Sequence, residues 1–114
     1  YSKRNDSKTV GINVARNVLN YIENQDFSTI NNTYFPSSTG LDKVQITRDT
    51  CNKSPLPADS CENMLQTVVN NVTYRATVTL TKHQDSDLQN YLIPVEVKII
   101  WNGRETSVEG VLKK

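Results

Sequence analysis

The chain has few of the residues on which enzymes and cofactor proteins depend. Its 114 residues include one histidine, two cysteines, four glycines and four prolines. The sequence contains no glycine-rich phosphate loop, no Gly-x-Ser-x-Gly and no His-Glu-x-x-His. These absences exclude the usual P-loop, serine-hydrolase and zinc-peptidase signatures. We therefore expect neither an enzyme nor a bound cofactor.

Long apolar runs and an excess of one charge are also missing. Thirteen basic and twelve acidic residues leave a net charge of +1, so no overall field draws the chain to nucleic acid or to an anionic membrane. No apolar run approaches the ~20 residues of a membrane span. A chain of this length favours a single globular domain over residues 1–114, with one hydrophobic core.

The two cysteines, Cys51 and Cys61, enclose a short loop that contains prolines. No second pair of metal ligands accompanies them, so zinc binding is disfavoured. A local disulfide is favoured over two free thiols, and it would contribute about 2 to 3 kcal/mol by the chain-entropy model. A disulfide places the protein outside the cytosol. Asp85 and Asp87 lack the glycine and terminal glutamate of an EF-hand loop, so we predict no metal site.

The segment Asp6 to Asp26 is predicted to form a long amphipathic helix. Its apolar residues recur at spacings of three and four, which is typical of one helical stripe; they are Val10, Val14, Ala15, Val18, Leu19 and Ile22. No capping box marks its beginning. The segment is therefore either the continuation of a longer helix or an ordinary first helix with a plain cap.

The later part of the chain predicts an antiparallel sheet. Leu41–Arg48 is predicted to be the first strand, while Val72–Lys82 and Ile93–Trp101 have apolar residues at every second position. Asn102-Gly103 is a strong hairpin signal, because a type I′ turn needs positive φ at both central residues. A two-residue turn fixes the register of the last two strands. The expected pairs are Trp101 with Arg104, Ile99 with Thr106, Val97 with Val108, and Ile93 with Leu112.

Two segments lack a sustained period. We interpret Phe27 to Gly40 as a long loop and Glu62 to Val69 as a helical turn. The predicted fold class is α+β, with one long N-terminal helix packed on an antiparallel sheet of about four strands.

The basic side chains of the sheet region form a candidate ligand surface. It comprises Arg75, Lys82, His83 and Lys98. Acidic residues such as Asp85 and Glu96 are interleaved with them, which is typical of an ordinary mixed surface. A catalytic histidine needs an orienting carboxylate and a nucleophile or substrate pocket, and the sequence around His83 identifies neither. His83 is therefore interpreted as a solvated loop residue.

Three segments together resemble the soluble domain of type IV pilin-like proteins. They are the helical Val14–Ile22, the strand Tyr74–Leu80, and the closing Val95–Val108 with its apolar strand, Trp, short turn and Ser-Val strand. The resemblance is closest to minor pilins and type II secretion pseudopilins. It implies a transmembrane half-helix upstream of Tyr1 and a subunit anchored in the membrane before assembly. The cysteines depart from the family pattern, since they lie between the first two predicted strands and not around a C-terminal loop.

The resemblance implies a structural subunit of a type IV pilus or type II secretion-like filament. The expected location is a bacterial cell-surface pilus, and the expected partners are other pilin subunits. One alternative is a pilus-tip binding module for DNA uptake or adhesion, although the near-zero net charge argues against DNA binding by the isolated domain. A secreted enzyme or inhibitor of unrelated α+β fold is a third hypothesis. The expected assembly surface is an exposed helix face at Lys3, Lys8, Gly11, Asn13 and Asn17.

Overall fold

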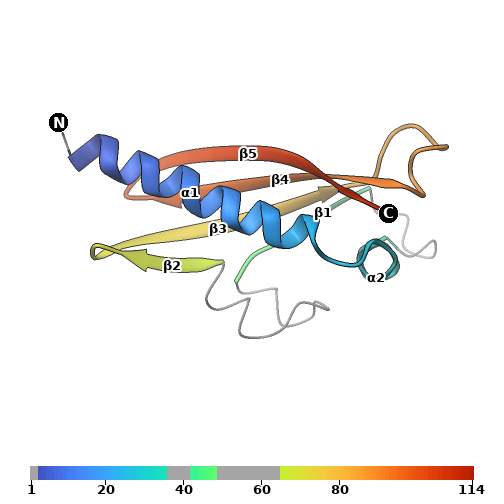
Figure 1. Cartoon of the computed structure of the whole chain (residues 1–114), viewed down its shortest axis with the longest axis horizontal. Helices are drawn as coiled ribbons and strands as arrows, with labels where there is room; N and C mark the ends of the chain where they lie inside the picture. The colour runs from blue at the N-terminus through green and yellow to red at the C-terminus, as the bar shows by residue number, and fades with distance from the viewer. Residues whose placement is uncertain (1–2, 36–41, 49–64) are drawn as a thin grey trace.

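The computed structural model describes residues 3–35, 42–48 and 65–114, with side chains from Ser7 onward. It is an α+β domain in which a long helix lies along one face of a five-stranded antiparallel sheet (Figure 1). The elements in chain order are α1 (Lys3–Glu23), α2 (Phe27–Tyr34), β1 (Lys43–Ile46), β2 (Gln66–Val69), β3 (Val72–Thr81), β4 (Leu92–Trp101) and β5 (Arg104–Lys113). The predicted fold class is confirmed at this level. The sheet has one strand more than expected, and a second helix is present.

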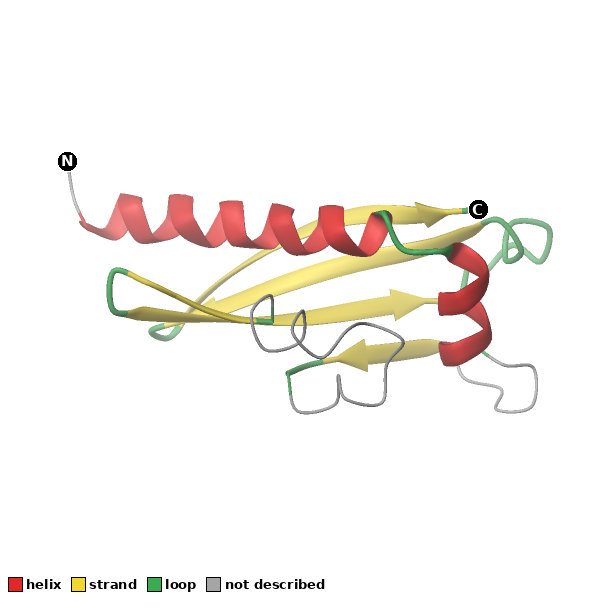
Figure 2. Cartoon of the chain, turned by 60° about the horizontal axis from the view of Figure 1, so that its bottom comes forward, coloured by secondary structure: helices red, strands yellow, loops and turns green. Residues whose placement is uncertain are grey.

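The core lies between α1 and the inner face of the sheet (Figure 2). Ala15, Val18, Leu19 and Ile22 are all buried there, as the helical stripe predicted. The sheet meets them with alternate residues of its three long strands, and the buried ones are Tyr74, Ala76, Val78, Leu80, Ile93, Val95, Val97, Ile99, Trp101 and Leu112. The apolar residues repeat about every 3.6 positions along the helix and every two positions along the strands. Each element therefore presents one apolar face, and the two faces pack together.

The β4–β5 hairpin has the predicted turn and the predicted register. Asn102 and Gly103 have φ values of 45° and 74°, as a type I′ turn requires. The turn brings Trp101 opposite Arg104, and the ladder continues to Leu92 opposite Lys113. The four predicted pairs are confirmed.

A second hairpin, between β2 and β3, was not predicted. Asn70 and Asn71 have φ values of 51° and 64°, so the same turn geometry is made here by two asparagines, which tolerate this region better than other non-glycine residues. The prediction of a helical turn is wrong for Gln66–Val69, which is a strand. Glu62 to Met64 lie outside the described residues.

The edge of the sheet beside β3 is shared by β1 and β2. β1 pairs with β3 up to Ile46 opposite Val78. β2 pairs with β3 from Gln66 opposite Arg75, and the amide of Ala76 donates to the carbonyl of Leu65 (3.0 Å). β1 and β2 therefore act as one edge strand that is interrupted in sequence, since residues 47–65 intervene between its two halves.

The segment after α1 is a helix where a loop was predicted. Asp26 is the N-cap of α2: its Oδ2 accepts hydrogen bonds from the amide (3.0 Å) and the hydroxyl (2.7 Å) of Thr29. Phe27 and Ile30 are buried beneath it, and the amide of Phe35 donates to the carbonyl of Asn31 (2.9 Å) at its end. The loop prediction is wrong for Phe27–Tyr34, while its last five residues, 36–40, are outside the described residues.

Candidate functional site

The expected assembly surface on α1 is only partly an exposed face. Lys8, Asn13 and Asn17 are exposed. Gly11 is buried, and a Cβ atom added to it would lie 2.8 Å from Cζ3 of Trp101. The expectation that Gly11 is exposed is wrong, because it lies on the same stripe as Ala15 and Val18. The side chain of Lys3 is outside the described part of α1.

The four residues of the candidate ligand surface do not form one surface. Arg75 and Lys98 lie on neighbouring strands of the sheet face opposite α1, where Arg75 is opposite Ile100 and Lys98 is opposite Thr77. Lys82 and His83 follow the other end of β3. Lys82 is seven positions after Arg75, which corresponds to about 23 Å along an extended strand. The structure therefore groups these residues in two pairs.

Local hydrogen bonds and an ion pair engage three residues of this region. Lys98 Nζ lies 3.2 Å from Glu105 Oε2, with both side chains largely exposed, so this pair contributes at most about 1 kcal/mol. His83 Nδ1 accepts a hydrogen bond from the amide of Asp85 (3.0 Å), and Asp85 Oδ1 accepts one from the amide of Asp87 (2.8 Å). The side chains of His83 and Asp85 thus accept hydrogen bonds from backbone amides of their own loop.

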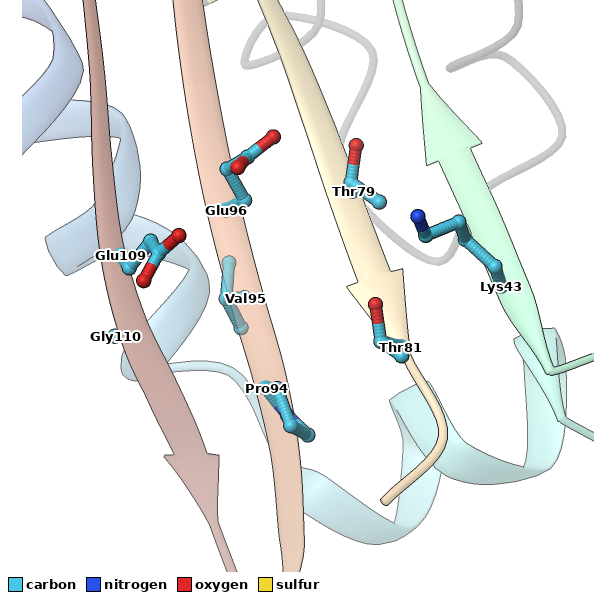
Figure 3. A pocket seen from close by; sticks show the side chains of 8 residues that line it. All are labelled: Lys43, Thr79, Thr81, Pro94, Val95, Glu96, Glu109 and Gly110. Carbon is cyan, nitrogen blue, oxygen red and sulfur yellow. The ribbon is translucent and has the colours of Figure 1, made fainter. Parts of the chain in front are cut away.

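The outer sheet face carries an acidic hollow of about 260 Å³. Both helices lie behind the sheet in the view of Figure 3. Glu96 and Glu109 are directly opposite each other on β4 and β5, and Thr79 is opposite Glu96. The hollow is lined by Lys43, Thr79, Thr81, Pro94, Val95, Glu96, Glu109 and Gly110. Directly opposed like charges are destabilising in a sheet.

A second hollow, of about 420 Å³, lies where the edge strand is interrupted. We call it the arginine hollow; it is lined by Thr47, Arg48, Leu65, Gln66, Arg75, Ala76, Thr77 and Ile100. Arg75 belongs to the predicted ligand surface, whereas Arg48 was not predicted. No local pattern could have found Arg48, because its place beside Arg75 depends on where β1 ends against β3.

Within the described residues, no group of three or more histidine, cysteine, aspartate or glutamate side chains is placed to hold a metal ion. The proposed disulfide partners, Cys51 and Cys61, lie outside the described residues. Neither helix in the described part of the chain combines the length and hydropathy that a membrane crossing requires.

No protein-family model, no curated protein and no solved structure matches this chain. The resemblance to type IV pilin-like proteins therefore rests on the sequence segments given above, and its functional content is a proposal.

Proposed function

We propose that this domain is a structural subunit, of the minor pilin or pseudopilin kind, in a type IV pilus or type II secretion-like filament. The supporting observation is the way α1 divides its surface. Its apolar stripe is used within the domain, against the sheet. Its other side is exposed at positions from Lys8 to Asn20, which leaves it accessible to neighbouring helices.

The composition of this exposed side suits a packing surface. The exposed residues of α1 from Lys8 onward are Lys8, Thr9, Asn13, Arg16, Asn17 and Asn20. Three of them are asparagines, two are basic and none is acidic. Amides can be buried between helices if they are hydrogen-bonded, whereas unpaired charges carry a much larger desolvation penalty. Interface cores are correspondingly depleted of charged residues.

The proposal includes the setting in which the subunit works. Its partners are other pilin-like subunits, and its membrane contact before assembly is made by a helical segment outside this chain. On the cell surface Cys51 and Cys61 are oxidised to a disulfide. Mass spectrometry of the protein under non-reducing conditions tests this point, since two freely alkylatable thiols would contradict both the disulfide and the extracellular location.

The alternative role, DNA uptake or adhesion at a pilus tip, has less support from the geometry. Arg75 and Lys98 are separated from Lys82 and His83 by most of a strand, and Lys98 is paired with Glu105. A strand of nucleic acid binds along a continuous row of cations, and these residues do not make one.

The test of the filament role uses the full gene product in its source organism. Lys8→Glu and Asn17→Glu introduce charge on exposed positions of α1, so each isolated domain should melt close to the wild-type temperature. We expect both variants to be depleted from the sheared filament fraction. Lys113→Glu, an exposed change at the end of β5, is the matched control and should leave incorporation unchanged. Normal incorporation of both helix variants would overturn the proposal.

A further inference from the structure

We propose that the arginine hollow binds a single oxyanion, a carboxylate or a phosphate, that is carried next to a short apolar group. Arg48 and Arg75 both line this hollow, and Ile100 adds an apolar side chain to the same lining. Such a ligand would bind whether or not the domain assembles into a filament.

The interruption of the edge strand explains why a hollow is present at this position. β1 and β2 approach each other along the edge of β3 but are joined through residues 47–65. Arg48 follows the end of the first half, and Gln66 begins the second half opposite Arg75. Arg75 in turn has Ile100 opposite it on β4. Residues of β2, β3 and β4 and of the segment that follows β1 therefore meet around one gap.

The electrostatics of the hollow favour an anion. Among the described residues, its lining has two arginines and no acidic side chain. In the described part of the chain, the ion pair of the outer sheet face is Lys98 with Glu105, and neither Arg48 nor Arg75 is paired with a carboxylate. Guanidinium groups bind carboxylate and phosphate in a bidentate manner, with charge-assisted hydrogen bonds. The half-buried amide of Gln66 adds a further hydrogen-bonding group to the lining.

The size and surroundings of the hollow favour a small ligand over a polyanion. A volume of about 420 Å³ accommodates one or two side chains, and Ile100 is 44% exposed beside it. Glu105 lies directly opposite Ile100 on β5, with Glu96 and Glu109 further along the same face. These carboxylates repel a chain of phosphates crossing the sheet but not a single anion that ends in the hollow.

Titration of the ¹⁵N-labelled domain with hexanoate or inorganic phosphate, followed by NMR, tests this site. Hexanoate has both the anion and the apolar group, and phosphate has the anion alone. We expect hexanoate to shift the amides of Gln66, Arg75 and Ile100 with a Kd of about 1 to 10 mM. Hexylamine, which has the tail and the opposite charge, should cause no shifts there.

Substitutions separate the hollow from the general charge of the face. Arg48→Gln and Arg75→Gln should each weaken binding about tenfold, because each removes a charge-assisted hydrogen bond. Both side chains are exposed, so the variants should fold normally, which a thermal melt checks. Lys98→Gln removes the same charge from the same face without touching the hollow, and should change the Kd less than about twofold.

The remaining comparisons identify the ligand class. If the tail of hexanoate contacts Ile100, then Ile100→Thr should weaken the binding of hexanoate but not the binding of phosphate. Phosphate binding that depends on both arginines and equals hexanoate binding would support the anion site and assign it to phosphate. Absence of shifts up to about 50 mM of either probe, or equal weakening by Lys98→Gln, would overturn the proposal.

Discussion

A Cβ atom added to Gly11 would lie 2.8 Å from Cζ3 and 2.9 Å from Cη2 of Trp101. The first half of α1 therefore contacts the last residue of β4 at a distance that only a glycine permits. Tyr74 of β3 lies beside this contact, with its ring centroid 5.5 Å from that of the indole and its hydroxyl donating to the carbonyl of Ser7 (3.4 Å). Burial raises the pKa of Tyr74, so this phenol stays protonated and remains a donor.

Replacing Gly11 by leucine should destabilise the domain by about 2 kcal/mol or more, because a rigid buried indole occupies the space. Chemical denaturation measures the loss. Asn13→Leu on the exposed side of the same helix is the control and should change the free energy of unfolding by less than about 0.5 kcal/mol.

The contact itself is tested in a Trp101→Ala background. There the penalty of Gly11→Leu should shrink, since neighbouring residues are not additive. An unchanged penalty would show that the cost arises in the helix and not at the indole.

The sequence predicted the parts of the fold that local rules determine. The register of β4 and β5 follows from the Asn102-Gly103 turn and from the apolar residues at every second position of β4, and those signals agree. The β2 strand was missed because four residues, Gln66 to Val69, are too few to establish a period. α2 was missed although Asp26 is a good N-cap and Phe27 and Ile30 have helical spacing, because the turn-forming residues after them dominated the interpretation.

The candidate site was harder to predict for a physical reason. Gly11 adds nothing to a hydrophobic pattern, yet it lies seven residues before Val18 and four before Ala15, on the buried stripe. Arg48 and Arg75 are distant in sequence and share a hollow only because the edge strand breaks beside them. Placement of this kind depends on the tertiary fold.

Replacing Asn71 in the Asn70-Asn71 turn by glycine should increase the stability of the domain. Asn71 has a φ of 64°, a region that costs most L-residues about 1 to 2 kcal/mol but that glycine adopts freely. Asn71→Gly should therefore stabilise the domain by about 0.5 kcal/mol, and Asn71→Val should destabilise it by about 1 to 2 kcal/mol. Urea midpoints of the two variants check this. A lower midpoint for Asn71→Gly would show that the asparagine side chain itself stabilises the turn.

The cap of α2 should make stability depend on pH. The hydroxyl of Thr29 and, to a smaller extent, its amide donate hydrogen bonds to the Asp26 carboxyl. They hold the pKa of this carboxyl below the usual 3.8. The ionised cap therefore stabilises the fold above the unfolded-state pKa of about 3.9, and this stabilisation is lost as pH falls through the lower, folded-state value.

Asp26→Ala should accordingly lower the melting temperature at pH 7, with a difference from wild type that narrows below about pH 4. Asp26→Asn keeps a hydrogen-bond acceptor without the titration, so its melting temperature should vary less over that range. A difference between wild type and Asp26→Ala that stays constant down to about pH 2 would exclude the carboxylate as the cause.

The exposed edge of β5 is protected at one amide by the end of α1. The amide of Val111 donates to Glu23 Oε2 (3.2 Å), and the adjacent Gly110 leaves room for this carboxylate, since a Cβ there would lie 2.8 Å from the same oxygen. An edge strand presents unpaired backbone groups, and a glutamate reaching across from the helix satisfies one of them.

Glu23→Ala should therefore speed hydrogen exchange at the Val111 amide and cost about 1 kcal/mol of stability. Gly110→Ala should speed exchange at the same amide although Glu23 is retained, because the added methyl group displaces the Glu23 carboxylate. Glu109→Ala, on the same strand but on the outer face, is the control and should leave the Val111 amide protected. If all three variants exchange there at the wild-type rate, the hydrogen bond from Val111 to Glu23 does not protect this edge in solution.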